Sequence, residues 1–185
     1  MNEIELERTF LIQKMPEEVR RAMYGNADTA KRGDLPMTEG VEPVRIVDVY
    51  IPDGPEHSHL RLRQKGERYF ITKKTPMQAG DASSQLEQTI ELMRAEYEAL
   101  AQCSEKRVVK DRYRVTLAGQ PAEVDVFLDK LQGLVLVDFE FENTAAKDAF
   151  VPPKGFIEVT ELEAIAGGML AGRSYEEVKD ELPEG

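Results

Sequence analysis

The chain has 185 residues, with 24 lysines and arginines against 35 aspartates and glutamates, and a formal net charge of −11 at pH 7. This length suits one domain with a sizeable core, or a domain plus a tail, and the acidic balance argues against a dedicated surface for nucleic acid or anionic membranes, though not against a local basic pocket. Cys103 is the only cysteine, no signal peptide is visible and no apolar run approaches about 18 residues, so we expect a cytoplasmic protein without disulfides or membrane spans.

In chain order, the sequence first predicts a strand at 3–12, where apolar and polar residues alternate. A helix follows around 16–25, because Pro16 and two acids are typical of a helix start and Gly25 of a helix end. The Gly-, Pro- and Asp-rich residues 26–43 are predicted as a loop. Further strands are expected at 44–51, 59–64, 68–74, 107–117, 121–129 and 134–142. Many short strands at regular spacing are typical of a sandwich or a barrel.

The stretch SSQLEQTIELMRAEYEALAQCS allows two interpretations. Its apolar residues recur every three or four positions from Leu86 to Leu100, which is the pattern of one amphipathic helix. Its first part also fits a strand, with Glu87, Thr89 and Glu91 on one face. Periodicity alone leaves both open.

Nearly every predicted strand has one ionic and one apolar face. The simplest interpretation is an antiparallel sheet with its ionic faces in water. However, the signs of the charges segregate, because strands 3–9, 121–129 and 134–142 are acidic while 59–65, 68–74 and 107–114 are basic. Acids also recur two positions apart, so that like charges lie side by side on one face.

A divalent cation would turn this repulsion into ligation, since hard ions take carboxylate oxygens. Arginines and lysines facing such a cation would suit a polyphosphate, and a closed sheet of about eight strands is just wide enough for one small ligand. The charge pattern therefore favours a polar-lined barrel with apolar outer faces covered by helices. It predicts one central cavity that receives Glu5, Glu7, Arg61, Arg63, Lys74, Asp125, Asp138 and Glu140.

An ordered series of motifs resembles the CYTH-domain family, also called triphosphate tunnel metalloenzymes, which includes class IV adenylate cyclases, thiamine triphosphatases and inorganic tripolyphosphatases. ELERTFLI resembles the N-terminal E-x-E-x-K signature, LRLRQ the R-x-R strand, YFITKKT the following lysine strand and VVKDRYRV the K-x-R strand. EVDVFLDKLQGLVLVDFEFEN resembles the segment that ends in E-x-E, and AFVPPKGFIEVTE the closing region of short bacterial members. One such motif would be weak, but the ordered series is specific for the fold.

The resemblance implies a mainly β fold, an eight-stranded antiparallel β-barrel with a charged tunnel and flanking helices. The barrel would span about 1–160 and a C-terminal helical segment about 161–185. SSQLEQTIEL would be a strand, with the helix starting near Met93. The tunnel would hold Mg²⁺ or Mn²⁺, and the metal ligands by resemblance are Glu5, Glu7, Asp138, Glu140 and, as a further ligand, Asp125.

By the same resemblance, the phosphate-binding residues are Arg61, Arg63, Lys74, Lys110 and Arg112. Glu87, Lys110 and Thr9 are candidate catalytic residues, with Glu87 ordering the basic groups or a water. Alternatives remain open at each position. Glu5 and Glu7 could be wet surface acids, Lys110 and Arg112 could form structural ion pairs, and Asp125 could orient an arginine.

The expected function is metal-dependent hydrolysis of a linear triphosphate: inorganic tripolyphosphate, or a nucleoside or thiamine triphosphate. Thr9 stands where the family has lysine, Gln85 where related short members often have an acid, and TELEAIAGGMLAGRSYEEV departs from the usual ending. We therefore expect weakened activity, with a non-catalytic polyphosphate- or nucleotide-binding module and a class IV-type cyclase as alternatives. The expected partner is a triphosphate-containing small molecule, with a homodimer left open. His57 and His59 are expected at a strand entrance.

Overall fold

The computed structural model describes residues 2–25, 40–52, 60–76 and 84–184, and only the backbone of 2–5, 84 and 85. Over these residues, nine strands form one sheet in the order β5-β4-β3-β2-β6-β7-β8-β1-β9, and every pairing is antiparallel. The strands are β1 (Asn2–Leu11), β2 (Val44–Ile51), β3 (Leu60–Lys65), β4 (Arg68–Pro76), β5 (Ser84–Leu92), β6 (Arg107–Leu117), β7 (Gln120–Phe127), β8 (Val135–Glu140) and β9 (Ile157–Glu158).

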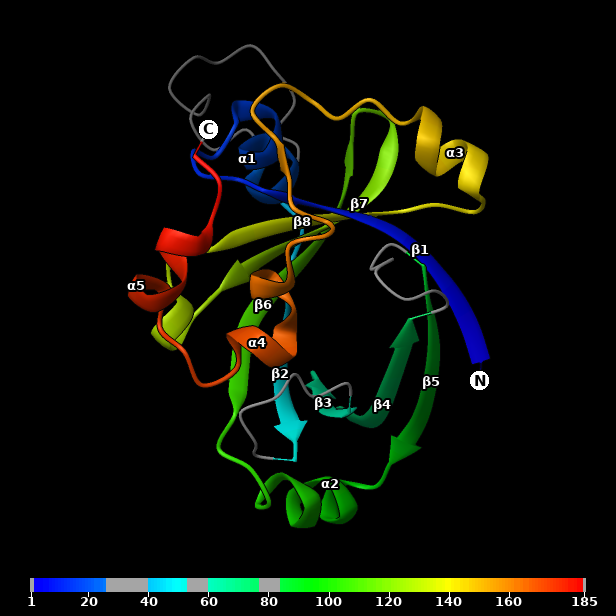
Figure 1. The fold of residues 1–185 in the computed structure, drawn as a ribbon, viewed down its shortest axis with the longest axis vertical. Helices are drawn as coiled ribbons and strands as arrows, with labels where there is room; N and C mark the ends of the chain where they lie inside the picture. Colours follow the sequence, from blue (N-terminus) through cyan, green and yellow to red (C-terminus); the bar gives the residue numbers. More distant parts are fainter. Residues whose placement is uncertain (1, 26–39, 53–59, 77–83, 185) are drawn as a thin grey trace.

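The sheet closes on itself through β1. The first half of β1, up to Leu6, pairs with β5, and the second half, from Glu7, pairs with β8. Strands β1–β8 therefore form a ring in which each closing contact uses only half of β1 (Figure 1). The two-residue β9 adds to β1 beside Phe10. The predicted eight-stranded antiparallel barrel is confirmed, and β9 is an additional short strand.

The ambiguous stretch divides into a strand and a helix. β5 ends at Leu92, and α2 (Arg94–Ala101) begins after Met93, so the strand implied by the resemblance is confirmed and the single helix is wrong. The Glu96 carboxylate accepts a hydrogen bond from the Met93 backbone N–H at 2.7 Å, which caps the helix at that point. β5 pairs with β4 on one side and β1 on the other, and these tertiary contacts override the helical spacing. Ile90 from the apparent apolar stripe is 65% exposed.

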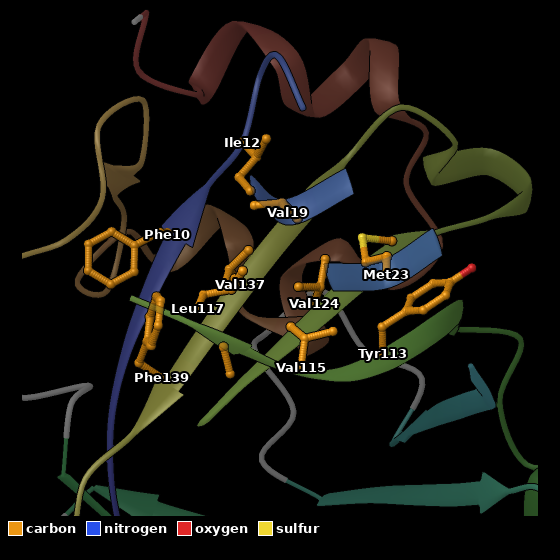
Figure 2. Close-up of a cluster of buried hydrophobic side chains, with 11 residues drawn as sticks. Phe10, Ile12, Val19, Met23, Tyr113, Val115, Leu117, Val124, Val137 and Phe139 are labelled. Carbon is orange, nitrogen blue, oxygen red and sulfur yellow. The ribbon is translucent and has the colours of Figure 1, made fainter. Parts of the chain in front are cut away.

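Two sets of apolar strand residues face outward, toward the helices. α1 (Glu17–Tyr24) buries Val19 and Met23 against the outer side of β6, β7, β8 and β1, where Val124 and Phe139 are fully buried (Figure 2). A second cluster lies under α2, where Tyr97 packs against residues of β2 and β3. Because side chains alternate along a strand, these contacts turn the ionic residues toward the inside of the ring.

After β8, the described chain forms the short helices α3 (Thr144–Ala149), α4 (Gly167–Leu170) and α5 (Tyr175–Val178), with 3₁₀ turns at Glu163–Ile165 and Lys179–Glu181. A further 3₁₀ turn, at Asp129–Leu131, lies between β7 and β8. Leu170 and Val178 are buried in a third cluster with residues of β7 and β8. No helix in the described ranges is long and apolar enough to cross a membrane. Most of the predicted loop at 26–43, and both His57 and His59, lie outside the described residues.

Candidate functional site

A cavity of about 490 Å³ lies inside the ring of strands. Its walls carry the cations of β3, β4 and β6 and the acids of β1, β2, β7 and β8, and the segment 160–170 contributes to its lining. The charged residues that line it are Glu7, Asp48, Arg61, Arg63, Lys74, Lys110, Arg112, Glu123, Asp125, Asp138, Glu140, Glu161 and Glu163.

The structure thus places most of the predicted site residues around one cavity, where Thr9 also lies. Glu87 contacts this group from β5, with its carboxylate 3.5 Å from the Arg61 guanidinium and 3.7 Å from Lys74 Nζ. Glu5 lies on β1 opposite Gln85, and its side chain is outside the described part of the chain.

A more open hollow of about 890 Å³ lies outside the ring, between Arg8, Glu158 and the C-terminal Leu182. Here Arg8 donates to both carboxylate oxygens of Glu158, at 2.8 and 2.6 Å, and to the Phe150 carbonyl at 2.8 Å. Because Arg8 makes these hydrogen bonds within the protein, it is less suited to binding a ligand. We therefore assign the candidate site to the inner cavity, where opposite charges converge.

Asp125 organises the cations of β6. Its side chain is almost fully buried, and Arg112 Nε and Nη2 each donate to it at 2.6 Å. Lys110 Nζ donates to the same carboxylate. Burial alone would raise the pKa of Asp125, but Arg112 and Lys110 hold it well below its usual range. Both carboxylate oxygens are therefore ionised and already bound to cations.

Arg63 and Asp48 make a second such pair. Arg63 Nε and Nη2 donate to the two oxygens of Asp48, each at 2.7 Å, and Asp48 is 1% exposed. Burial raises the pKa of Asp48, and the charge and hydrogen bonds of Arg63 outweigh this and lower it well below its usual range. The acid is therefore ionised inside the ring.

The carboxylates of β1 and β8 have more distant cations: Arg112 Nη2 is 3.5 Å from Asp138, and Lys74 Nζ is 3.7 Å from Glu7. Glu7 and Glu140 lie directly opposite each other across the two strands, and Asp138 is opposite Thr9. The Thr9 hydroxyl donates to Asp138 Oδ1 at 2.8 Å. Burial, Glu7 and Asp125 together raise the pKa of Asp138 to about 7, and burial with Glu123 and Glu7 raises the pKa of Glu140.

These raised pKa values test whether the acids fit a metal. A carboxylate that holds its proton to neutral pH for lack of positive charge would be relieved by a cation, and Mg²⁺ and Mn²⁺ prefer carboxylate oxygens. The donor set Glu7, Asp138 and Glu140 therefore fits in chemistry. Over the described residues, no three acidic, histidine or cysteine side chains are already drawn together as a metal site. These side chains would have to turn toward a shared ion.

Asp48 and Glu123 also line the cavity and were not predicted as site residues. Glu123 lies directly opposite Arg114 on β6, which donates to it at 2.9 Å, and Arg112 also contacts it. Its sequence signal was its position two residues before Asp125, on the same face. Asp48 had a signal in VRIVDVYI, as the one acid of a strand whose other residues, except Arg45, are apolar. The segment 160–170 had none, since nothing local reveals that it reaches the cavity.

A scan against protein-family models gives no match. A curated inorganic triphosphatase of Nitrosomonas europaea is 35% identical to this chain over 160 residues, which cover 85% of this chain and 89% of that protein. The crystal structure of the inorganic triphosphatase NE1496 is similar with a TM-score of 0.58 and 30% identity, covering 90% of this chain and 93% of that one. A putative adenylate cyclase from Bacillus halodurans has a TM-score of 0.53 at 16% identity over 80% of this chain and 85% of that one, which supports the fold alone.

A closed antiparallel ring with apolar outer faces and a tunnel-like cavity lined by both signs of charge defines the class of protein. Together with the extended identity to a triphosphatase, it shows that the chain belongs to the CYTH-domain, or triphosphate tunnel metalloenzyme, family. The curated relative is, by its name, a hydrolase.

Proposed function

We propose that this chain is a metal-dependent hydrolase of linear triphosphates, with inorganic tripolyphosphate as its first candidate substrate. One observation carries the proposal: a cationic wall and an acidic wall face a single cavity inside the ring. A polyphosphate with a bound divalent cation has the matching pattern of charge. The relative named as an inorganic triphosphatase supports the choice of substrate.

In this proposal the cationic wall binds the phosphates, through Arg61, Arg63, Lys74, Lys110 and Arg112. Arg61 Nε is buried and has no hydrogen-bond partner among the described residues, so it is available to a phosphate oxygen. Asp125, whose oxygens are bound to Arg112 and Lys110, orients these two cations and is not a metal ligand. This is the alternative that the sequence left open for Asp125.

The acidic wall would hold Mg²⁺ or Mn²⁺ through Glu7, Asp138 and Glu140, with Glu5 as a further ligand. Such an ion would polarise the phosphate oxygens and neutralise the charge that develops on them. Thr9 keeps Asp138 in place through its hydroxyl, so we assign it a positioning role. A nucleoside or thiamine triphosphate would present the same terminal phosphates.

Hydrolysis requires a water to attack the terminal phosphorus while the bridging P–O bond breaks. Glu87, held by a hydrogen bond from the Thr89 hydroxyl at 2.7 Å and facing Arg61 and Lys74, is placed to order these cations or the water. Burial lowers the pKa of Lys110. We assign its Nζ to the leaving phosphate, where a positive charge or a proton assists departure.

A phosphate-release panel tests the function. Tripolyphosphate, ATP and thiamine triphosphate are each incubated with Mg²⁺, Mn²⁺ or EDTA. We expect release from tripolyphosphate that needs a metal, and loss of release in Glu7→Gln but not in Glu91→Gln, whose carboxylate pairs with Arg68 on the surface. Release that persists in EDTA, or equally in both variants, would contradict the proposal.

A non-catalytic polyphosphate-binding module is the second candidate, and Thr9 is the observation that favours it. Thr9 lacks the charge of the family lysine, and its hydroxyl is bonded to Asp138. Such a module would be stabilised by tripolyphosphate without releasing phosphate. The same panel separates the two functions, and a cyclic product from ATP would instead indicate a cyclase.

A further inference from the structure

Asp48 is a buried charge in the middle of β2, where every other residue except Arg45 is apolar. Its neighbours Ile46 and Val49 are fully buried, and Asp48 itself is 1% exposed. Burying a carboxylate is costly unless it is paired and hydrogen-bonded. An aspartate at this position therefore needs a reason beyond packing, since an apolar residue would fill the site at less cost.

The pairing is specific in geometry. Asp48 lies directly opposite Arg63 in the β2–β3 register, and the two bonds of 2.7 Å use Nε and Nη2 of the guanidinium. A planar guanidinium held at one edge by a carboxylate is fixed in orientation. Nη1 remains outside this fork, and both residues line the cavity.

Arg112 is held in the same way, because Asp125 lies directly opposite it in the β6–β7 register and accepts from its Nε and Nη2. Arg61 has no comparable partner, since its nearest carboxylate, Glu87, is 3.5 Å away. Two of the three cavity arginines are thus fixed by buried cross-strand aspartates. Asp48 differs from Asp125 because its described hydrogen bonds go to one cation, Arg63, whereas Asp125 binds both Arg112 and Lys110.

We propose that Asp48 is a positioning residue for phosphate recognition: it holds the Arg63 guanidinium so that its remaining N–H edge faces the phosphate in the cavity. The proposal rests on the proposed function. A guanidinium that is already oriented loses less conformational entropy when the anion binds and needs no reorganisation during the reaction.

Net charge alone predicts the opposite effect of an Asp48 substitution on anion binding, so the two explanations can be distinguished. Asp48→Asn removes a negative charge beside the cationic wall, so Coulomb attraction alone would strengthen anion binding. If Asp48 acts by positioning, we expect Asp48→Asn to raise the KM for tripolyphosphate and lower kcat/KM by about tenfold or more, as for loss of a charged hydrogen-bond partner.

The chain offers a matched control. Asp111 lies opposite Arg45 across β6 and β2 and accepts from its Nε and Nη2 at 2.5 and 3.1 Å, but Arg45 is 58% exposed and the pair is outside the cavity lining. Asp111→Asn removes the same kind of cross-strand fork and the same charge. We expect its kcat/KM to stay within about twofold of wild type.

A second comparison separates positioning from a general loss of folding. Asp48→Asn is introduced into Arg63→Gln, where there is no guanidinium left to position, and thermal melts report the folded fraction of each protein. We expect no further loss of kcat/KM in the double variant. If Asp48→Asn alone fails to fold, the comparison of Arg63→Gln with the double variant still tests whether Asp48 acts through Arg63.

Each outcome decides the matter. A tenfold loss that persists in the Arg63→Gln background, a loss no larger than that of Asp111→Asn, or a lower KM in Asp48→Asn overturns the positioning role while leaving the hydrolase intact. If wild type binds tripolyphosphate without hydrolysing it, the same comparisons are made on the dissociation constant. A wild type that neither binds nor hydrolyses tripolyphosphate overturns both proposals.

Discussion

Asp125 and Asp138 are inward-facing aspartates on adjacent strands, β7 and β8, yet their electrostatic environments are opposite. Arg112 and Lys110 hold the pKa of Asp125 well below its usual range, whereas burial and nearby acids raise the pKa of Asp138 to about 7. Environments that push the pKa values of neighbouring acids apart also divide their roles. In the proposed function, Asp125 therefore orients cations, and Asp138 is the acid that would gain most from a metal.

The raised pKa of Asp138 predicts how the metal-free protein responds to pH. Between pH 4 and pH 7 the folded state keeps a proton that the unfolded chain has lost, so the contribution of Asp138 to stability falls as pH rises through this range. Asp138→Asn should therefore stabilise the protein in EDTA at pH 8 by about 1–3 kcal/mol, at about 1.4 kcal/mol per pKa unit.

This advantage should shrink toward pH 4, and urea unfolding at several pH values measures it. Asp111→Asn, outside the cavity, is the control and should show no such trend. An Asp138→Asn protein that is less stable than wild type at pH 8 in EDTA would contradict the inference that ionised Asp138 destabilises the metal-free fold.

Thr9 gives the second prediction at this scale. Thr9→Lys places the charge of the family signature next to Asp138 and Glu7, on the face where the Thr9 hydroxyl now donates to Asp138. One charged donor to phosphate contributes roughly 1.5–3 kcal/mol, or about 10- to 100-fold in rate. We therefore expect slow hydrolysis of tripolyphosphate by wild type and faster hydrolysis by Thr9→Lys, measured as phosphate release.

Thr9→Ser, which keeps the hydroxyl, is the control and should turn over at about the rate of wild type. Fast turnover by wild type together with slower turnover by Thr9→Lys would mean that another residue fills the role of the signature lysine.

Among the secondary-structure elements, the local sequence pattern predicted where strands lie better than it predicted which strands pair with one another. Alternation identified most strands to within a few residues, because most of them carry an ionic face toward the cavity and a mainly apolar opposite face. It could not decide whether Leu86 and Ile90 belonged to a helix, since β5 is a strand through its pairing with β4 and β1. Closure through two halves of β1 is likewise a property of the tertiary structure.

Helix α4 packs closely against the ring at Gly167, which lies beside Tyr50 of β2. A Cβ added at Gly167 would lie 1.8 Å from the Tyr50 hydroxyl oxygen and 2.7 Å from Cζ, and Tyr50 is only 6% exposed. Gly167→Ala therefore forces α4 away from β2 or Tyr50 from its place. We expect a destabilisation of about 1–3 kcal/mol in urea unfolding, as for other overpacked sites.

Tyr50→Phe removes the oxygen that makes the closest contact. Gly167→Ala should thus cost less in the Tyr50→Phe background than in wild type. Equal costs in the two backgrounds would show that this contact does not determine the position of α4.

For the whole molecule, two apolar clusters lie outside the ring and the charges lie inside it, while members of the third cluster, such as Phe127, Leu136 and Leu170, line the cavity beside the charges. The segregation of acidic and basic strands allowed the interior to be predicted from the sequence, together with the resemblance to the family. Asp48 was missed because its partner does not lie in its own strand, where the only cation, Arg45, pairs with Asp111 instead. Arg63 becomes its partner only through the β2–β3 register.

Under the proposed function, a cavity whose acids are only partly balanced by cations should make the stability of the whole protein depend on its ligand. Mg²⁺ or Mn²⁺ together with tripolyphosphate would supply cations to Glu7, Asp138 and Glu140 and anions to the cationic wall, and would bind only the folded state. By mass action, ligand at about 100 times its dissociation constant stabilises by roughly 2.7 kcal/mol. We expect a rise in melting temperature that is larger at pH 8 than at pH 5, where Asp138 holds its proton.

General screening of a chain with a net charge of −11 could also raise the melting temperature. The controls are therefore sodium chloride at matched ionic strength, metal alone and tripolyphosphate alone, and we expect the pair to exceed each of them. Glu140→Gln should reduce the shift because it removes an inward acid of β8, whereas Glu91→Gln should not. Melts that show no shift with any pair of triphosphate and metal would count against the hydrolase and the binding module alike, because both require the folded cavity to bind that pair.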